Sequence, residues 1–302
     1  MTSSLRPSRA LRSGNGHINV SFEVFPPKND TMALGLSETI DRLSSLQPSF
    51  VSVTCGAGGS STSLTAATVD EIKRETRLPV AAHLTCASAS RAEIDATLCR
   101  YQAADVKHIV ALRGDSQAGI GQPFRAHPEG YQSTHELVAA IKRISNAEVS
   151  VSAYPERHPE SESLATDLDM LAAKVDAGAD RALTQFFFDN DHYYRYLEQV
   201  RARGIEVPIV PGILPLQNFE QARLFAQRCG ATIPTWLADR FDGLDEDVDT
   251  RQKVAVAVAV EQVLDLVDHG VTDFHFFTMN RADLVYPICH LLGLRPRVGV
   301  AA

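Results

Sequence analysis

The 302-residue sequence has few cysteines, and their arrangement argues against a disulfide framework and against a zinc site. Their number is odd, no two of them form a CxxC pair, and no histidine follows at zinc-ligand spacing. The cysteines are Cys55, Cys86, Cys99, Cys229 and Cys289. We therefore expect reduced thiols in a reducing cytosol, and no metal.

The sequence also lacks a long apolar run and a surplus of basic residues. The longest candidate run, residues 254–260, is far shorter than the roughly 18 apolar residues of a membrane helix. Lys and Arg total 29 against 37 Asp and Glu, a formal net charge of −8, which argues against a nucleic-acid partner because a phosphate backbone selects for a basic stripe. We expect a globular cytoplasmic protein without a membrane partner.

The N-terminal segment is rich in Ser and Arg and contains no acidic residue over residues 1–16. Such a composition weakly resembles an organelle transit peptide, but no apolar signal-peptide core follows. We expect residues 1–18 to form a disordered tail, with a targeting segment as the alternative.

Eight short apolar runs, rich in β-branched and aromatic residues, follow one another along the chain. They are residues 19–24, 50–54, 80–84, 108–112, 149–154, 181–186, 207–210 and 273–277. Helical patterns follow the runs, at residues 36–46, 65–75, 91–104, 136–144, 165–177, 193–203 and 219–228, with a long helix at 247–269. Eight βα units without a linker predict a single (β/α)₈ TIM barrel over residues 19–302, with extra helices between strands seven and eight.

An open doubly wound sheet is the competing architecture, and it would be favoured by a G-x-G-x-x-G turn after the first strand. That turn reads FPPKND, so a bound dinucleotide is not held by the Rossmann fingerprint. In a barrel, by contrast, the site lies at the C-terminal ends of the strands, and polar residues gather there in this sequence.

The strand-end segments resemble those of the bacterial methylenetetrahydrofolate reductase family, in order and at compatible spacing from about residue 21 to residue 296. They are SFEVFPP, FVSVTCGAGG, HLTC, HIVALRGD, AYPERHPE, KVDAGADRALTQFFFD, PGILP, FDGLDED and FHFFTMNRA. The resemblance implies non-covalent FAD that takes a hydride from NADH or NADPH. It further implies ping-pong reduction of 5,10-methylenetetrahydrofolate to 5-methyltetrahydrofolate, feeding one-carbon metabolism and methionine synthesis.

Glu23 and Asp115 are the two residues to which the resemblance assigns catalytic roles. Opening the methylene bridge is helped by protonating the departing nitrogen, which requires a carboxylic acid kept neutral near pH 7. Phe22, Phe25 and two prolines surround Glu23 in the sequence, and burial of that kind raises a carboxyl pKa. In the family, Asp115 lies beside the flavin and also favours a cationic folate intermediate.

The other site residues come from the same resemblance. Its flavin contacts are Thr54, His83, Arg113, Gly114, Asp115, Tyr131, Ala153, Tyr154, His158, Asp167 and Lys174. Its substrate contacts are Glu23, Thr54, Gln185, Phe225 and Arg281. We expect Arg113, Lys174 and Arg281 to form a local positive field for anionic ligands despite the negative net charge.

One position departs from the family pattern. Phe277 occupies a place where Tyr is common, so any hydrogen bond that this hydroxyl makes to the substrate is absent here. The resemblance also favours a homo-oligomer and leaves the choice between NADH and NADPH open.

Two other function classes remain at the level of sequence. One is a metal-free barrel lyase or aldolase that uses Lys174 or Lys107 to form an imine. The other is a non-catalytic folate-binding subunit that has kept the barrel. Retention of Glu23, Asp115 and Gln185 together argues against the second.

Overall fold

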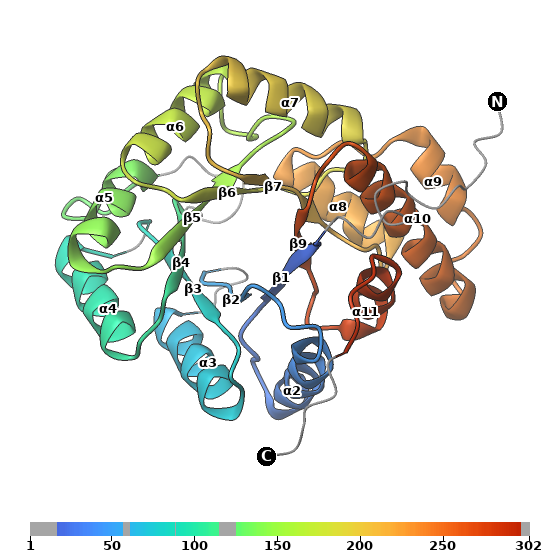
Figure 1. Cartoon of the computed structure of the whole chain (residues 1–302), viewed down its shortest axis with the longest axis horizontal. Coiled ribbons are helices and arrows are strands. Elements are labelled where there is room, and N and C mark those ends of the chain that lie inside the picture. Colours follow the sequence, from blue (N-terminus) through green and yellow to red (C-terminus); the bar gives the residue numbers. More distant parts are fainter. Residues whose placement is uncertain (1–16, 57–60, 88, 115–124, 297–302) are drawn as a thin grey trace.

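The computed structural model describes residues 17–56, 61–87, 89–114 and 125–296. Its strands are all parallel and its helices surround them, as Figure 1 shows. The strands are β1 Asn19–Val24, β2 Val51–Val53, β3 Val80–Thr85, β4 His108–Leu112, β5 Glu148–Ala153, β6 Arg181–Thr184, β7 Ile209–Val210, β8 Gly212–Ile213 and β9 Asp273–Phe277. This arrangement confirms the predicted α/β TIM barrel.

The helices of the described residues lie close to where the periodicity predicts them. They are α2 Asp30–Ser44, α3 Thr62–Glu75, α4 Arg91–Ala103, α5 Thr134–Ile144, α6 Leu164–Asp176, α7 Asn190–Ala202, α8 Phe219–Cys229, α9 Thr235–Phe241, α10 Val248–Asp268 and α11 Ala282–Leu291. Side-chain caps set the starts of most of these helices, such as the capping box of Ser90 and Glu93 on α4, whereas α9 and α11 begin without one. Of the helices described, none is both long and apolar enough to cross a membrane.

The sheet order is β7-β6-β5-β4-β3-β2-β1-β9-β8. β7 lies within the seventh strand predicted at residues 207–210, whereas β8 is a short strand beyond it that was not predicted, so the two are halves of one interrupted strand. β7 pairs with β6, β8 pairs with β9, and Pro211 stands between the halves. Proline lacks the N–H that a continuous ladder needs at this point. Because β7 and β8 stand at the two ends of the sheet order, the barrel closes through this divided strand.

Two faces of the strands build two different cores. The outward face, which packs against the helices, includes Phe22 and Phe276, whose rings lie 6.2 Å apart. A separate cluster is formed by Phe50, Ala81, Val110, Leu183 and Val210. Because strand residues alternate between faces, this second cluster fills the barrel interior. Residues 1–16 of the predicted tail lie outside the described residues, and the first strand begins at Asn19 as predicted.

Candidate active site

Glu23 lies on the interior face of β1, between two histidines from other strands. Phe22 and Val24 belong to the outward core, so the alternation of β1 turns the Glu23 side chain into the barrel. Glu23 Oε2 lies 3.4 Å from His83 Nε2 and 3.5 Å from His275 Nε2. The carboxyl side chain is 21% exposed, whereas the His275 side chain is fully buried. A solvent-reachable carboxyl therefore contacts two buried imidazoles.

These neighbours change the expected protonation of Glu23. Burial raises the pKa of Glu23, but a hydrogen bond with His275 and the charges of His83 and His275 outweigh burial, and the net pKa lies below its usual value. Burial lowers the pKa of His83 to about 4, against the opposing effect of Glu23. His83 is thus neutral near pH 7, and we attribute the lowered pKa of Glu23 at that pH mainly to His275.

The prediction that apolar neighbours raise the pKa of Glu23 is therefore wrong. Phe22, which was expected to desolvate the carboxyl, points away from it on the opposite face of β1. The interior neighbours of Glu23 are imidazoles instead of apolar rings. Glu23 is a carboxylate here, and it must take up a proton before it can act as an acid.

The contacts of His275 extend from the carboxyl to a hydroxyl one layer deeper in the barrel. His275 Nδ1 lies 2.7 Å from Ser21 Oγ, and these two residues are paired in the β1–β9 register. The two nitrogens of His275 thus face Ser21 and Glu23. The hydroxyl fixes the orientation of the ring that contacts the carboxyl.

The ends of β2 and β3 add buried polar atoms without a hydrogen-bond partner in the described structure. They are Thr54 Oγ1 and His83 Nε2, both predicted to contact flavin. The backbone of Thr54 is fixed, since its N–H donates to Val24 O and its carbonyl accepts from Thr65 Oγ1. Buried polar atoms normally have partners, so Thr54 Oγ1 is available to a ligand, and His83 Nε2 has only its contact with Glu23.

The end of β4 carries Arg113 and Gly114. Arg113 Nη1 lies 2.7 Å from Glu160 Oε2. Gly114 has φ +85°, and a Cβ there would lie 2.9 Å from Cβ of both Thr85 and Ala87. Only glycine fits this backbone between its neighbours. Asp115 lies outside the described residues, so its predicted role stays a prediction.

A polar group follows β5 and contains three more of the predicted flavin contacts. Tyr154 packs edge-on against His158 with ring centres 4.7 Å apart. Asp167 accepts a hydrogen bond from His158 N–H at 2.7 Å and another from Ser161. Asp167 therefore holds the loop that carries His158 against the start of α6.

Lys174 is a buried cation on α6. Its side chain is only 6% exposed, and its Nζ donates to Ser152 O at 2.6 Å. Burial lowers the pKa of Lys174 to about 8, with Asp167 opposing. No carboxylate of the described chain lies within ion-pair distance of Lys174. Asp167 therefore acts on the pKa of Lys174 from a longer distance. Ala153, at the end of β5, is buried and its carbonyl accepts from Gln185 N–H at 2.8 Å.

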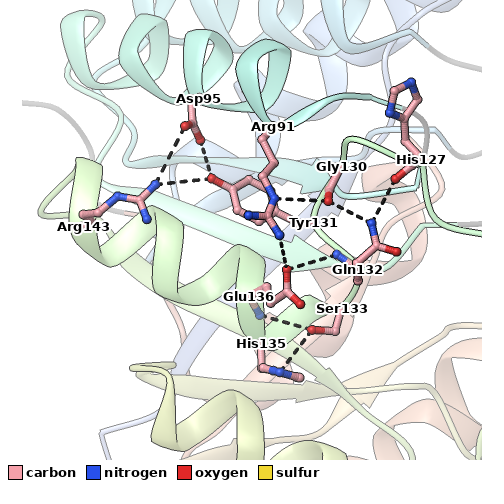
Figure 2. Close-up of polar contacts among 10 residues, drawn as sticks. All are labelled: Arg91, Asp95, His127, Gly130, Tyr131, Gln132, Ser133, His135, Glu136 and Arg143. Carbon is pink, nitrogen blue, oxygen red and sulfur yellow. Dashed lines mark hydrogen bonds and ion pairs between the residues drawn. The ribbon is translucent and has the colours of Figure 1, made fainter.

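Tyr131 is a predicted flavin contact whose hydroxyl is hydrogen-bonded within the protein, as Figure 2 shows. Its hydroxyl donates to Asp95 at 2.6 Å and accepts from Arg143 at 3.4 Å. The guanidinium of Arg91 lies over its ring, 5.1 Å from the centroid, and also bonds Glu136. The network ties the segment before α5 to α4, so Tyr131 contributes support between helices.

Three aromatic residues gather beside the ends of β6 and β9. The rings of Phe186 and Phe225 stack with centres 5.2 Å apart, and Phe186 meets Phe277 edge-on at 6.1 Å. Phe225 on α8 remains 41% exposed, so it is not an ordinary core residue. Gln185 holds its own side chain by accepting from Phe186 N–H at 3.0 Å, which leaves its amide nitrogen for another partner. A small cavity between Tyr154, Gln185 and Gly230 joins this group to the β5 loop.

Two of the three expected cations are paired with acids, so the predicted positive field is weaker than expected. Arg281 precedes α11 and forms an ion pair with Asp283, while Arg113 pairs with Glu160. The field was inferred from residue type at strand ends, without the contacts that pair Arg113 with Glu160 and Arg281 with Asp283. The larger cavity, of about 300 Å³, lies away from the strand ends between α7, α9 and α10.

Sequence reasoning missed His275, Ser21 and Asn280. The signal for His275 was available, because a histidine alternates with phenylalanines in DFHFF and must face the interior. Ser21 alternates in the same way in NVSFEV. Asn280 was part of a quoted strand end, but only its neighbour Arg281 was selected. Asn280 contacts Phe25, which lies 255 residues earlier in the sequence, and the sequence alone does not show this contact.

Known proteins resemble this chain over nearly its whole length. The family described as methylenetetrahydrofolate reductase matches residues 8–293. The 5,10-methylenetetrahydrofolate reductase of Escherichia coli is 47% identical over 289 residues, covering 96% of this chain and 95% of that protein. The protein of the same name from Buchnera aphidicola subsp. Acyrthosiphon pisum is 39% identical over 287 residues, covering 95% and 96%.

A solved structure supports the fold at much lower identity. It is described as an uncharacterized protein from Clostridium thermocellum that binds two copies of 5-methyl-5,6,7,8-tetrahydrofolic acid. It matches with a TM-score of 0.63 at 12% identity and covers 92% of this chain and 95% of that chain. The family match and the full-length relatives agree with the ordered strand-end segments, and the chain therefore belongs to the methylenetetrahydrofolate reductase family of enzymes.

Proposed function

We propose that this chain reduces 5,10-methylenetetrahydrofolate to 5-methyltetrahydrofolate with NADH or NADPH, through non-covalently bound FAD in a ping-pong cycle. The observation that carries the proposal is Glu23 at the end of β1, in contact with two buried imidazoles, in a chain of this family. The product would feed one-carbon metabolism and methionine synthesis. A cytoplasmic homo-oligomer completes the proposal, and sedimentation of the purified protein tests the oligomer.

The residues present fit a flavin dinucleotide. Thr54 Oγ1 and His83 Nε2 are buried without hydrogen-bond partners in the described structure, and Gly114 leaves no room for a side chain. Arg113, Lys174 and the His158 loop would hold the pyrophosphate and ribose groups, and Tyr154 would lie beside them. Bound FAD supplies hydride transfer between the nicotinamide and the folate.

Glu23 would deliver the proton that the departing folate nitrogen needs. The carboxyl has 21% of its side chain open to solvent, and a substrate that covers it removes that contact with water. Desolvation disfavours the charged form and raises the carboxyl pKa toward the working pH. The proton is then held at an oxygen that two imidazoles fix in position. In this proposal the lowered pKa belongs to the ligand-free state.

Three residues would bind and orient the folate. The free amide nitrogen of Gln185 would donate to the pteridine edge. The half-exposed ring of Phe225 would stack on the substrate, supported from behind by Phe186. Arg281 would take the glutamate carboxylate by exchanging its exposed ion pair with Asp283.

The imine-forming alternative finds little support in the structure. Lys107 is 70% exposed, pairs with Asp105 and precedes β4, at the end of the strand opposite the site. Lys174 has the lowered pKa that an imine-forming lysine needs, but its Nζ already donates to a backbone carbonyl in a buried position. Trapping with borohydride and a carbonyl substrate, in a colourless protein, would favour this alternative.

The first test is the absorption spectrum of the purified protein before and after anaerobic NADH. We expect flavin bands that NADH bleaches and that methylenetetrahydrofolate restores. A protein without flavin absorbance, also after incubation with FAD, would contradict the proposal. A flavin that bleaches but is never restored by the folate would keep the flavoprotein and reject the substrate.

The second test separates the two half-reactions in Glu23→Gln. Glutamine keeps the shape of the side chain and cannot donate an acidic proton. We expect flavin reduction by NADH to stay within about twofold of the wild type, and folate reduction to fall by at least a hundredfold. An exposed control, Glu38→Gln on α2, should change neither rate. Equal loss in both half-reactions of Glu23→Gln would remove Glu23 as the acid.

A further inference from the structure

The backbone that carries Glu23 is held by the turn that follows β9. β1 ends at Val24 and β9 ends at Phe277, and Glu23 and Phe277 form the last pair of their register. Beyond that pair, the N–H and the hydroxyl of Thr278 both donate to Glu23 O, at 3.2 and 2.7 Å. The carbonyl of Glu23 is therefore fixed by two donors from one residue.

The Asn280 side chain continues this attachment past the end of the sheet. Its Oδ1 accepts from Phe25 N–H at 2.9 Å, and its Nδ2 donates to Phe25 O at 2.8 Å. The amide thus bonds both backbone groups of one residue, as a neighbouring strand would. Pro26 and Pro27 follow at once and offer no N–H, so Phe25 is the last residue of this segment at which such a pairing can be made.

The turn itself adopts a backbone that only some residues accept readily. Met279 and Asn280 have φ 53° and φ 55°, and Arg281 N–H donates to Thr278 O at 3.0 Å to close the turn. Asparagine is enriched in this left-handed region, whereas methionine is not. Thr39 of α2 fixes the turn from outside, because its hydroxyl donates to Asn280 O at 2.8 Å. Strained backbone of this kind persists where the surroundings hold it, and it gathers at functional sites.

We propose that Asn280 is a positioning residue for Glu23, because its side-chain amide joins Phe25 to the β9 turn and so fixes the backbone beside the catalytic carboxyl. This inference rests on the proposed role of Glu23 as proton donor. The hydrogen bonds of Thr278 on one side and of Asn280 on the other hold the three-residue span from Glu23 to Phe25. Loss of the amide frees Phe25 and lets the carboxyl move relative to His83 and His275.

The test variant is Asn280→Gly, which accepts positive φ and removes only the side-chain bonds. Its matched control is Asn19→Ala. Asn19 Nδ2 donates to Asp273 Oδ1 at 3.0 Å and links the same two strands at their other end. We expect both variants to lose similar thermal stability and to bind FAD. We expect only Asn280→Gly to slow folate reduction, by about ten- to a hundredfold, with flavin reduction by NADH within about twofold.

A double-mutant cycle decides whether Asn280 acts through Glu23. In the Glu23→Gln background, Asn280→Gly should slow folate reduction by less than about threefold, because the group it positions is already gone. The pH profile of folate reduction should shift in Asn280→Gly and stay unchanged in Asn19→Ala. If the fold-losses of Asn280→Gly and Glu23→Gln multiply in the double variant, Asn280 acts independently of Glu23 and the inference is overturned.

A second variant covers the case in which Asn280→Gly does not fold. Asn280→Asp keeps the acceptor for Phe25 N–H, tolerates positive φ and replaces the donor to Phe25 O by a carboxylate oxygen. We expect folate reduction in this variant to fall selectively, with flavin reduction preserved. Wild-type folate reduction in Asn280→Asp would overturn the inference alone. Wild-type folate reduction in Glu23→Gln would overturn the acid assignment first, and the inference with it.

Discussion

At the scale of single residues, the barrel interior combines the polar group around Glu23 with buried serines such as Ser52 and Ser150 and with an apolar cluster. His83 and His275 come from β3 and β9 and meet one carboxylate oxygen, although they lie far apart in the sequence. Below them, the interior is filled by residues such as Val110 and Leu183. His83 stays neutral near pH 7 in these surroundings, because burial lowers its pKa to about 4.

The buried His83 predicts a pH dependence of stability. Its pKa is lowered to about 4 in the folded protein, so between about pH 4 and about pH 6.5 the unfolded chain binds one more proton there. The contribution is complete above about pH 6.5 and is lost as the pH falls toward 4. Glu23 and His275 face His83 and stay in place in His83→Asn, so they do not create the difference.

Urea unfolding at about pH 7.5 and about pH 5 measures this contribution. The wild type should lose about 2 kcal/mol more unfolding free energy between these conditions than His83→Asn does. His17→Asn, at an exposed position before β1, should keep the wild-type difference. A His83→Asn variant with the same pH dependence as the wild type would show that the folded protein does not lower the pKa of His83.

Residue identities at strand ends were predictable, whereas their partners were not. The order and spacing of the segments pointed to Glu23, Gln185 and Arg281 as site residues, and these predictions await a test. The ion pairs of Arg113 and Arg281, and the imidazoles that contact Glu23, depend on which segments the fold brings together. The direction of a pKa shift depends on those partners, so the predicted rise in the pKa of Glu23 was wrong.

At the scale of secondary structure, periodicity predicted β1, β4 and β9 with the bounds that the structure shows. These strands combine β-branched or aromatic residues with polar ends, and no proline interrupts them. The seventh strand was predicted at residues 207–210, whereas the structure has β7 at Ile209–Val210 and a further short strand, β8, at Gly212–Ile213, because Pro211 cannot donate in the ladder. The strand predicted at residues 181–186 also ends early, at Thr184, and Gln185 follows it at the candidate site.

The close packing around β8 predicts that Gly212 cannot be replaced without a loss of stability. A Cβ on Gly212 would lie 2.2 Å from Thr184 O and 2.7 Å from Phe277 Cε2. We expect Gly212→Ala to lower the free energy of unfolding by roughly 3 kcal/mol or more, because neither a backbone carbonyl nor a packed ring can move away freely.

Gly35→Ala in α2 is the matched control, since nothing lies within 4 Å of the added Cβ. Alanine is the better helix former there, so this variant should gain up to about 1 kcal/mol. Thermal and urea unfolding compare the two. Similar stability of the two alanine variants would mean that the barrel does not close as tightly at Gly212 as the structure shows.

At the scale of the whole molecule, the net charge of −8 says little about where anions bind. The acids are spread over helices and loops, and several of them pair with the cations that the strand ends provide. Arg113 with Glu160 is the pair closest to the proposed flavin phosphates, and both side chains are about one-third exposed. A dinucleotide must therefore exchange this internal ion pair for its own.

This competition predicts that Glu160→Gln binds FAD more tightly than the wild type. Removal of the Glu160 charge removes one internal competitor of the pyrophosphate for Arg113, and an exposed pair contributes up to about 1 kcal/mol, which corresponds to a severalfold lower dissociation constant. Asp249→Asn on α10 changes the net charge equally and breaks only the pair with Lys253. It should leave FAD affinity unchanged, and salt should weaken FAD binding in all three proteins. Titration of apoprotein with FAD compares them, and equal tightening in both variants would assign the effect to net charge instead of to Arg113.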